Sequence, residues 1–339
     1  MNHKTAVVIL NWNGKHFLER FLDVLLERTP QPWAQVYIAD NGSTDESVSW
    51  LKETHPNLPL ILFDKNYGYT GGYNKALRQI DADYYVLLNS DVEVSPDWLP
   101  PLVEYLEQNK EYGICMPKVL SWTKQDTFEY AGACGGYIDR LGFPFCRGRI
   151  LTHIEKDEGQ YDHPVPVFWA SGVCMVVQAD LFHRLGGLDD DFFAHMEEID
   201  FCWRAHWAGY RAAVVPASTI FHVGGGTLPN DSPHKLYLNY RNNLLMLYKN
   251  LSKRGLVFIL PARWFLDYLS AVAYFFQGKW SFMGSVFKAH IHFWKKLRYM
   301  ERHKGIPTPN LRGVVYRRSI ILRFFLSFKN ITFSKLRMG

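Results

Sequence analysis

Four short apolar segments, each followed by a polar cluster, constrain the fold of this chain more than any other feature of its sequence. Segments of helical period separate them, and strands that alternate with helices in this way indicate a parallel α/β sheet. Ligands of such sheets bind just beyond the carboxyl ends of the strands, where the polar clusters are expected to lie. We predict the four strands at residues 5–10, 35–39, 60–63 and 84–88.

The chain is long enough for one large domain and an appendage. Its 339 residues are 47% hydrophobic, which is ample for a globular core. The formal charge is divided unevenly, because residues 235–339 hold 20 Lys and Arg against two acidic residues, whereas residues 1–234 hold 18 against 31. We therefore predict a catalytic domain over residues 1–234 and a basic region over residues 235–339 that contacts an anionic partner.

Three of the polar clusters suit a nucleotide and a metal ion. Asp40 begins the sequence DNGSTD at a strand end, where a carboxylate can accept hydrogen bonds from a base or a ribose, although the same residues also favour a plain turn and helix cap. Residues 66–74 hold three glycines before a helix, which lets backbone amides approach a diphosphate. Asp91 follows the fourth strand and could hold Mg²⁺ or Mn²⁺ together with phosphate oxygens.

Two further signals lie later in the chain. Glu197, Glu198 and Asp200 crowd three carboxylates into four residues, which raises their pKa values and suits a general base. Acidic residues are also common at the start of an ordinary helix. His222 follows a strand and precedes a run of glycines, so it is either a metal ligand or a structural histidine.

The basic region is rich in aromatic residues. Helical patterns at residues 237–250, 256–276 and 280–300 combine apolar faces with Lys and Arg, which is typical of helices that lie on a bilayer. An ordinary helical subdomain with a basic solvated face is the alternative. No run of about 18 uncharged apolar residues indicates a clean membrane-spanning helix. We expect an anionic membrane surface as the partner and no nucleic acid, because bulky apolar side chains interrupt the basic ones.

The cysteines favour a reducing compartment. Their number is odd and they form no CxxC pair, so a disulfide framework or a structural zinc site is not expected. The first residues do not have the pattern of a signal peptide. These features predict a cytoplasmic protein that is peripheral on the inner face of the cell membrane.

Seven motifs in register make the chain similar to family 2 glycosyltransferases of the GT-A fold, and particularly to bacterial rhamnosyltransferase-like members. The resemblance covers about residues 5–250. It implies an α/β fold with a mostly parallel central sheet flanked by helices, followed here by a basic, aromatic-rich helical extension. The motifs are VVILNWNG (7–14), DNGSTD (40–45), NYGYTGGYN (66–74), LLNSDV (87–92), WASG (169–172), GGLDDDFFAHMEEIDFCWR (186–204) and FHVGGG (221–226).

The resemblance implies where the donor and the metal ion bind. Asp40 is expected to hold the nucleobase or its ribose, and Asp91 and His222 are expected to hold Mg²⁺ or Mn²⁺. Asn89 stands at the first position of the family's DxD metal motif, so metal affinity rests heavily on Asp91. The other residues expected around the donor are Asn11, Asn13, Asn66, Gly68, Gly71, Gly72 and Asn74.

The resemblance also implies a catalytic pair and an acceptor site. The family's ED pair, whose second carboxylate is the general base, falls on Glu197 and Glu198. That base is usually Asp, so the longer side chain of Glu198 leaves Glu197 and Asp200 as alternatives. The residues expected beside the acceptor or a phosphate are Trp169, Ser171, Gly172, Arg241 and Asn242.

We therefore expect an inverting glycosyltransferase of cell-surface polysaccharide synthesis. It is expected to move a sugar, such as rhamnose, from a nucleotide-sugar donor to a hydroxyl of a glycan or polyprenyl-diphosphate-linked acceptor. An inactive membrane-bound scaffold of a glycan-assembly complex is one alternative, because Asn89 replaces an expected carboxylate. A sugar-phosphate nucleotidyltransferase is another, although residues 11–14 lack the basic, Gly-rich loop that such enzymes carry after the first strand.

Overall fold

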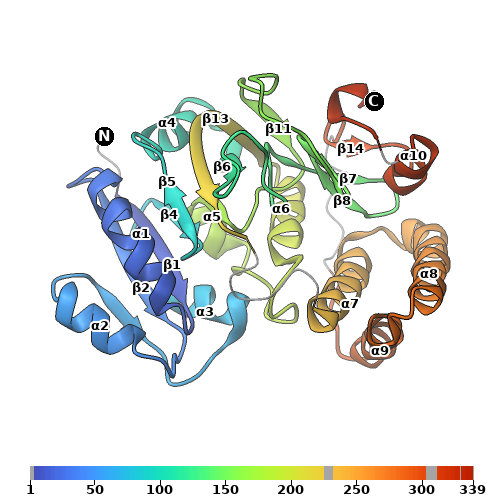
Figure 1. Ribbon diagram of the computed structural model, residues 1–339, viewed down its shortest axis with the longest axis horizontal. Coiled ribbons are helices and arrows are strands. Elements are labelled where there is room, and N and C mark those ends of the chain that lie inside the picture. Colours follow the sequence, from blue (N-terminus) through green and yellow to red (C-terminus); the bar gives the residue numbers. More distant parts are fainter. Residues whose placement is uncertain (1–3, 225–231, 303–310, 329, 339) are drawn as a thin grey trace.

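The computed structural model describes residues 4–224, 232–302, 311–328 and 330–338. Among these residues, nine strands form a central sheet, whose arrangement is visible in Figure 1. They are β1 (Thr5–Asn11), β2 (Ala34–Asp40), β3 (Leu60–Leu62), β4 (Tyr84–Leu88), β5 (Val92–Val94), β6 (Tyr112–Ser121), β11 (Val165–Val167), β12 (Cys174–Gln178) and β13 (Arg211–His222).

The central sheet is mixed. Its order is β11-β13-β6-β12-β4-β1-β2-β3, and β5 pairs with β13. The strands β3, β2, β1 and β4 run parallel, as the sequence predicted, whereas β12 runs antiparallel to both β4 and β6. All five residues of β4 are buried, which explains why the strand is a continuous apolar run and not an alternating one.

Helices pack on the sheet through apolar stripes on their surfaces. In α1 (Lys15–Arg28) the buried residues include Phe17, Phe21 and Leu25, which recur one helical turn apart. The same principle places the other helices of the catalytic domain against the strands. These are α2 (Ser47–Thr54), α3 (Gly68–Leu77), α4 (Pro100–Gln108), α5 (Ala179–Arg184) and α6 (Glu197–Trp207).

A second, smaller sheet lies partly within residues 120–165, a segment rich in Gly, Pro and aromatic residues for which no regular structure was predicted. Its order is β10-β9-β8-β7-β14, from β7 (Gly136–Asp139), β8 (Pro144–Cys146), β9 (Arg149–Ile150), β10 (His153–Ile154) and β14 (Val315–Tyr316). The last of these strands comes from the basic region and pairs in parallel with β7. The basic region therefore shares a sheet with the catalytic domain.

The basic region contains helices, as expected, in addition to β14. They are α7 (Pro233–Asn250), α8 (Lys253–Phe276), α9 (Trp280–Lys296) and α10 (Ile320–Leu326). Figure 1 shows α7, α8 and α9 as a group beside the catalytic domain, with α7 nearest to α6.

The sequence holds no uncharged apolar run that would indicate a clean membrane-spanning helix, but helix α8 could still cross a membrane. By length and composition it is long and apolar enough to do so, and only 22% of its most apolar 18-residue window is buried. Two charged residues interrupt the apolar run, which is why the sequence did not indicate a clean span. They are buried and paired, with Arg263 Nη2 lying 3.1 Å from Asp267 Oδ1.

Candidate active site

One cavity of about 740 Å³ brings together residues that lie far apart in the sequence. It opens at the carboxyl ends of β1 and β4 and beside the start of α6, the edge at which ligands of α/β sheets are expected. The predicted site residues that line it are Asn13, Asn66, Gly68, Asn89, Asp91, Ser171, Gly172, Glu197, Glu198 and His222.

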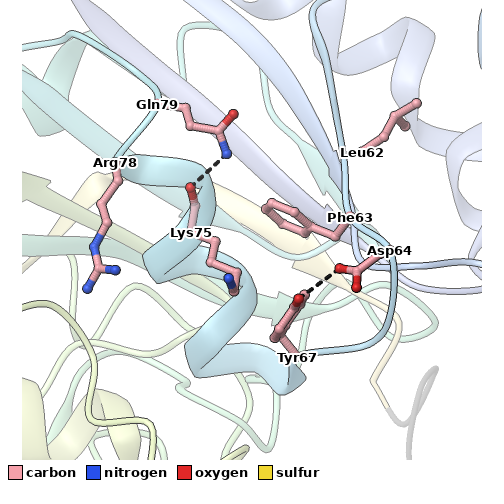
Figure 2. A pocket seen from close by; sticks show the side chains of 7 residues that line it. All are labelled: Leu62, Phe63, Asp64, Tyr67, Lys75, Arg78 and Gln79. Atoms are coloured by element: carbon pink, nitrogen blue, oxygen red, sulfur yellow. Dashed lines mark hydrogen bonds between the residues drawn. The ribbon is translucent and has the colours of Figure 1, made fainter.

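A second hollow, of about 480 Å³, lies between the end of β3 and α3 (Figure 2). Its polar groups largely satisfy one another, because Tyr67 donates to Asp64 Oδ1 at 2.7 Å and Gln79 Nε2 donates to the carbonyl oxygen of Lys75 at 3.0 Å. It contains none of the predicted site residues. The larger cavity is therefore the candidate active site.

The first polar cluster forms a hydrogen-bonded turn at one side of the cavity. Asp40 is buried and accepts hydrogen bonds from Asn11 Nδ2 at 2.9 Å and from the Ser43 amide at 2.9 Å. Asn13 lines the cavity in a left-handed conformation with φ of 51°. Its Oδ1 accepts from the Thr44 amide at 2.7 Å. Asp40 and Asn11 thus lie behind the wall to which Asn13 contributes.

The glycine-rich segment is already helical, which differs from the predicted loop. Gly68 begins α3 and lines the cavity, whereas Gly71 and Gly72 lie within the helix and away from it. A Cβ on Gly72 would approach Leu10 to 2.7 Å, so close packing of α3 on β1 requires this glycine. Asn74 also lies outside the cavity, and its Nδ2 donates to the carbonyl oxygen of Leu188 at 2.7 Å.

The first amides of α3 bind a protein carbonyl group. The Tyr69 and Thr70 amides donate to the carbonyl oxygen of Phe193 at 2.8 and 3.3 Å. Gly68 has φ of +75°, and a Cβ there would lie 2.5 Å from the Phe193 ring. The glycine thus permits contact with the turn before α6, and these two amides are not directed at a diphosphate in this structure.

Asp91 and His222 meet because β13 pairs with β5. His222 pairs with Val92 in the strand register, and its Nε2 lies 3.2 Å from Asp91 Oδ1. Glu129 lies on the other side of the ring, with Oε2 3.3 Å from Nδ1. All three residues are buried to more than nine-tenths. Sequence reasoning missed Glu129, because no motif marks it within a segment that seemed irregular.

The three groups perturb one another electrostatically. Burial disfavours the imidazolium form of His222, but its contacts with Asp91 and Glu129 outweigh burial and raise its pKa to about 10. Burial likewise opposes ionisation of Asp91, yet the hydrogen bond with His222 holds the pKa of Asp91 below its usual value. His222 is therefore protonated at neutral pH, and a metal ion that binds Nε2 has to displace that proton.

The donor set fits a divalent ion held by few protein ligands. Asp91 and Glu129 face opposite ring nitrogens, so the three side chains cannot converge on one ion. Accordingly, within the described ranges no group of three or more His, Cys, Asp or Glu side chains could hold a metal. Mg²⁺ is commonly bound through one or two carboxylates plus substrate phosphates, which Asp91 Oδ1 and His222 Nε2 can match. Asn89 also lines the cavity beside them.

Two carboxylates at the start of α6 face the same cavity. Burial raises the pKa of Glu198 to about 7. Burial and then the neighbouring Glu198 carboxylate raise the pKa of Glu197 well above its usual range. Each side chain has an Oε2 atom without a hydrogen-bond partner. A buried carboxylate whose pKa lies near neutrality is suited to proton transfer.

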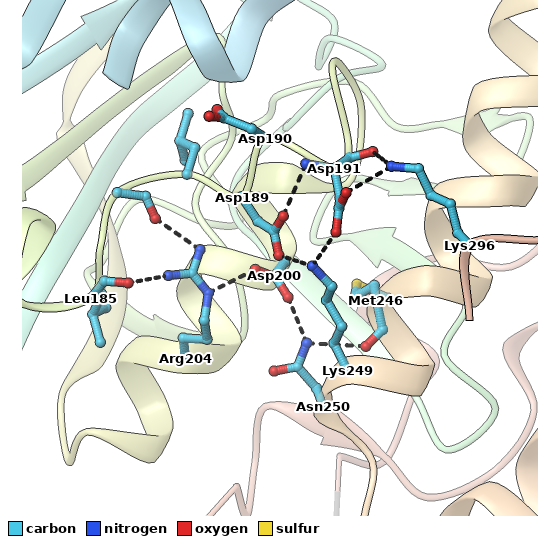
Figure 3. A network of polar contacts seen from close by, with 12 residues as sticks. Leu185, Asp189, Asp190, Asp191, Asp200, Arg204, Met246, Lys249, Asn250 and Lys296 are labelled. Atoms are coloured by element: carbon cyan, nitrogen blue, oxygen red, sulfur yellow. Dashed lines mark hydrogen bonds and ion pairs between the residues drawn. The ribbon is translucent and has the colours of Figure 1, made fainter. Parts of the chain in front are cut away.

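Asp200, the third carboxylate of the cluster, has a different environment. It is fully buried and does not line the cavity. Figure 3 shows it between Arg204 and Asn250, whose Nε and Nδ2 atoms donate to it at 2.7 and 2.6 Å. This corrects the expectation that Asp200 could serve as the base, because both of its oxygens are engaged in a structural network.

A strained turn carries the two cavity carboxylates. Phe193, His195 and Met196 have φ values of 67°, 71° and 74°, in the left-handed region that non-glycine residues rarely adopt. Each such residue costs roughly 1–3 kcal/mol and persists only when its surroundings hold it. The turn leads directly into α6, so it sets where Glu197 and Glu198 lie.

The residues expected at the acceptor divide into two sets. Ser171 and Gly172 line the cavity, where the Gly172 carbonyl oxygen accepts from Tyr69 at 2.7 Å. Trp169 is buried away from it, and its Nε1 donates to the Tyr137 carbonyl oxygen at 2.9 Å. Arg241 and Asn242 are likewise outside the cavity and contact the turn before α6.

Sequence reasoning also missed other residues in the cavity wall. Tyr69 and His195 lie within motifs that had been noticed, but their side chains were not assigned roles. His234 and Lys235 enter from the start of α7. Gly225 and Gly226 of the FHVGGG motif lie outside the described residues.

Residues 6–138 match the family model described as glycosyl transferase family 2. The chain contains a family 2 glycosyltransferase domain. The match covers the first polar cluster, which includes Asp40, and the part of the cavity wall that includes Asp91. The turn before α6, its two carboxylates and α7 lie beyond the matched residues.

The alignment with one curated relative extends over most of this chain. The N-acetylglucosaminyl-diphospho-decaprenol L-rhamnosyltransferase of Mycobacterium tuberculosis is 27% identical over 265 residues, which are 73% of this chain and 85% of the relative. The resemblance to rhamnosyltransferase-like members of the family is thereby confirmed.

Solved structures share the fold. GalNAc-T7 with UDP, GalNAc and Mn²⁺ aligns with a TM-score of 0.57 at 16% identity, over 73% of this chain and 48% of that one. The mannosyltransferase PcManGT from Pyrobaculum calidifontis, in complex with GDP-Man and Mn²⁺, aligns with a TM-score of 0.53 at 17% identity, over 89% and 77% of the two chains. The predicted GT-A fold is confirmed, and the chain is a glycosyltransferase.

Proposed function

We propose that this glycosyltransferase moves rhamnose, with inversion, from a nucleoside-diphosphate donor to a hydroxyl group of a polyprenyl-diphosphate-linked glycan. One observation carries the proposal: a carboxylate pair and an Asp–His pair line the same cavity. The relative from M. tuberculosis, whose name gives a rhamnosyl transfer to a decaprenol-linked N-acetylglucosamine, supports the choice of sugar and acceptor. The product would serve cell-surface polysaccharide synthesis.

Glu198 is the proposed general base. With a pKa of about 7 it is substantially ionised at neutral pH, and it can accept the proton of an acceptor hydroxyl as that oxygen attacks the anomeric carbon. Burial and the Glu198 carboxylate also raise the pKa of Glu197, so the adjacent carboxyl groups oppose each other's ionisation. Glu198 is the proposed proton acceptor of the pair.

Asp91 and His222 are the proposed ligands of Mg²⁺ or Mn²⁺. When bound, such an ion supplies positive charge that stabilises the departing nucleoside diphosphate. Gly68, Asn66 and Asn13 line the cavity wall next to the first polar cluster, where the nucleoside would bind.

We also propose that the enzyme binds the cytoplasmic face of the membrane through its C-terminal helices. Their exposed apolar residues lie among Lys and Arg residues, a combination that suits an anionic lipid surface. All five cysteines are free and buried, which is compatible with a reducing compartment. The exposed residues include Val257, Phe258, Phe265, Leu269, Val272, Phe276, Trp280, Ile291, Trp294, Leu322, Phe325, Leu326 and Phe328.

A donor panel tests the activity. Purified protein is incubated with dTDP-rhamnose, UDP-sugars and GDP-mannose, each with Mn²⁺, with Mg²⁺ and with EDTA, and released nucleoside diphosphate is measured. Metal-dependent release of dTDP from dTDP-rhamnose alone is the expected result. Release from another donor would replace rhamnose in the proposal. No release and no binding of any nucleotide would favour an inactive scaffold.

A further inference from the structure

Three carbonyl groups of the turn before α6 converge on one side chain. The amide nitrogen of Asn242 donates to the carbonyl oxygens of Phe192, Ala194 and His195 at 2.9, 2.7 and 2.7 Å. Its amide oxygen accepts from Arg241 Nε at 2.8 Å. Asn242 is fully buried. Its amide is therefore fully used within the protein and is not available to a substrate.

The turn needs this support. Its left-handed residues are not glycines, and such conformations persist when neighbouring groups hold them. Asn242 holds the carbonyl groups on either side of Phe193, while the carbonyl oxygen of Phe193 itself accepts from the first amides of α3. Arg241 Nη2 adds a second donor to the Phe192 carbonyl oxygen at 2.8 Å. Four consecutive carbonyl groups are thus fixed from two different elements.

We propose that Asn242 is a positioning residue, which fixes the turn so that Glu198 faces the cavity. The inference rests on the proposed role of Glu198 as the base. It gives Asn242 a different role from the acceptor contact expected from the sequence. It also makes α7, which lies outside the family match at residues 6–138, a necessary part of the active site.

The adjacent residue provides a matched control. Asn243 is also on α7 and is 2% exposed. Its amide nitrogen donates to the carbonyl oxygen of Gly142 at 2.8 Å, far along the chain from the turn. Asn242→Ala and Asn243→Ala therefore each remove one buried amide from neighbouring positions of the same helix, but only the first removes support from the turn.

The experiment compares the two variants with the wild type. Amide hydrogen exchange is followed for residues 192–199, and release of dTDP from dTDP-rhamnose with Mn²⁺ is measured across a pH series. We expect Asn242→Ala to speed exchange in this segment by about tenfold or more and to lower kcat by roughly 10²-fold. The donor KM should change little, and the pH midpoint should shift, because Glu198 moves. Asn243→Ala should leave all four quantities near the wild-type values.

A second variant distinguishes the loss of the amide donors from a general loss of folding. Asn242→Asp keeps the shape of the side chain but presents only acceptors to the three carbonyl oxygens, so it should show the same changes as Asn242→Ala. Equal effects of the Asn242 and Asn243 variants, or unchanged exchange in Asn242→Ala, would overturn the inference. If the wild type releases no dTDP, the proposed sugar transfer fails, and the exchange rates alone still decide whether Asn242 holds the turn.

Discussion

At the residue scale, Glu198 combines two conflicting properties. It is half-buried, which favours the protonated form, yet the proposed reaction requires the ionised form. Burial places its pKa at about 7, so both forms are populated near neutrality. Glu197, the other cavity carboxylate, lies at the same end of α6 and is buried.

The first prediction concerns the pH dependence of the rate. Because the proton must leave Glu198 before it can act as a base, kcat of the wild type should rise as pH increases through about 7. Glu198→Gln should lower kcat by roughly 10²–10⁴-fold and remove this rise. Initial rates from pH 5 to 9 check the prediction, with Glu155→Gln, at a buried carboxylate outside the cavity wall, as the control. Full activity in Glu198→Gln would exclude Glu198 as the base.

The second prediction concerns stability. A carboxyl group whose pKa is raised on folding stabilises the protein fully below its unfolded pKa, and this contribution is lost as pH rises through the folded value, about 7 here. Glu198→Gln should therefore have a higher Tm than the wild type at pH 8, and the difference should disappear near pH 4. Calorimetry at the two pH values tests this, and a lower Tm at pH 8 would contradict it.

The third prediction concerns Glu129. A carboxylate that holds the second nitrogen of a metal-binding histidine typically changes metal affinity by about 10–100-fold when it is altered. We expect Glu129→Gln to weaken Mn²⁺ binding by a factor in this range, as measured by electron paramagnetic resonance of free Mn²⁺. In a His222→Ala background the same substitution should have no further effect, because Glu129 acts through the ring. A full effect in that background would mean that Glu129 acts independently of His222.

At the element scale, the C-terminal helices expose more large apolar side chains than the rest of the described chain. Helix α8 is apolar but mostly unburied, and the two charged residues within its apolar run, Arg263 and Asp267, are paired with one another. His290 of α9 adds a third partner, with Nε2 3.2 Å from Asp267 Oδ2. Polar contacts thus join α8 to α9 on the inside and leave an aromatic face outside.

The fourth prediction tests that aromatic face. Phe258, Phe276 and Trp280 are 68%, 81% and 59% exposed, and each would contribute roughly 1.5–3 kcal/mol on full burial in lipid. Replacing all three by Ser should lower binding to anionic vesicles by at least about 10²-fold in flotation, while the Tm changes little. Leu62→Ser, at an exposed apolar position of β3, is the control. Equal binding by both variants would exclude this face as the membrane contact.

Local sequence patterns predicted the elements better than the partners of their side chains. The strands β1 and β4 were predicted almost residue by residue, because continuous apolar runs mark strands that are buried on both faces. Helix α3 begins at Gly68, within the glycine-rich segment that was expected to precede the helix. Gly68 contacts Phe193, which lies 125 positions away. No local pattern could reveal this contact.

The candidate site shows the same limit. Asp91, His222, Glu197 and Glu198 were predicted from motifs, and the structure brings them to one cavity. Glu129 reaches His222 only through tertiary packing, in a segment without helical or strand periodicity. Asn242 was noticed, but its three carbonyl partners lie 47 to 50 positions earlier and could not be inferred from spacing.

At the scale of the whole molecule, the basic region is joined to the catalytic domain by charged side chains, of which Lys249 is buried. Figure 3 shows Lys249 of α7 directed at Asp189 and Asp191, and Lys296 of α9 at Asp191. These contacts lie beside the turn that carries the cavity carboxylates. The acidic residues 1–234 and the basic residues 235–339 are therefore in direct contact, although the net charge of the chain changes sign between them.

The fifth prediction concerns this junction. Lys249 is 5% exposed, and Lys249→Met would leave two neighbouring carboxylates without their shared cation. Because Asp191 is partly exposed, we expect a loss of about 1–3 kcal/mol in the free energy of unfolding, as measured by urea denaturation. Lys156→Met, at an exposed pair with Asp126, should change it by no more than about 0.5 kcal/mol. If both variants lost the same free energy of unfolding, Lys249 would contribute no more to stability than a lysine of an exposed ion pair.

The pairing of β14 with β7 has a consequence for synthesis. Val315 lies opposite Ile138 and Tyr316 opposite Asp139, so the edge of the smaller sheet is filled by a strand that the ribosome makes much later. At roughly 5–20 residues per second, that edge waits on the order of ten seconds or more for its partner. A nascent chain in which β7 and β8 have already formed therefore exposes an open strand edge during this interval, and an open edge can pair with other strands.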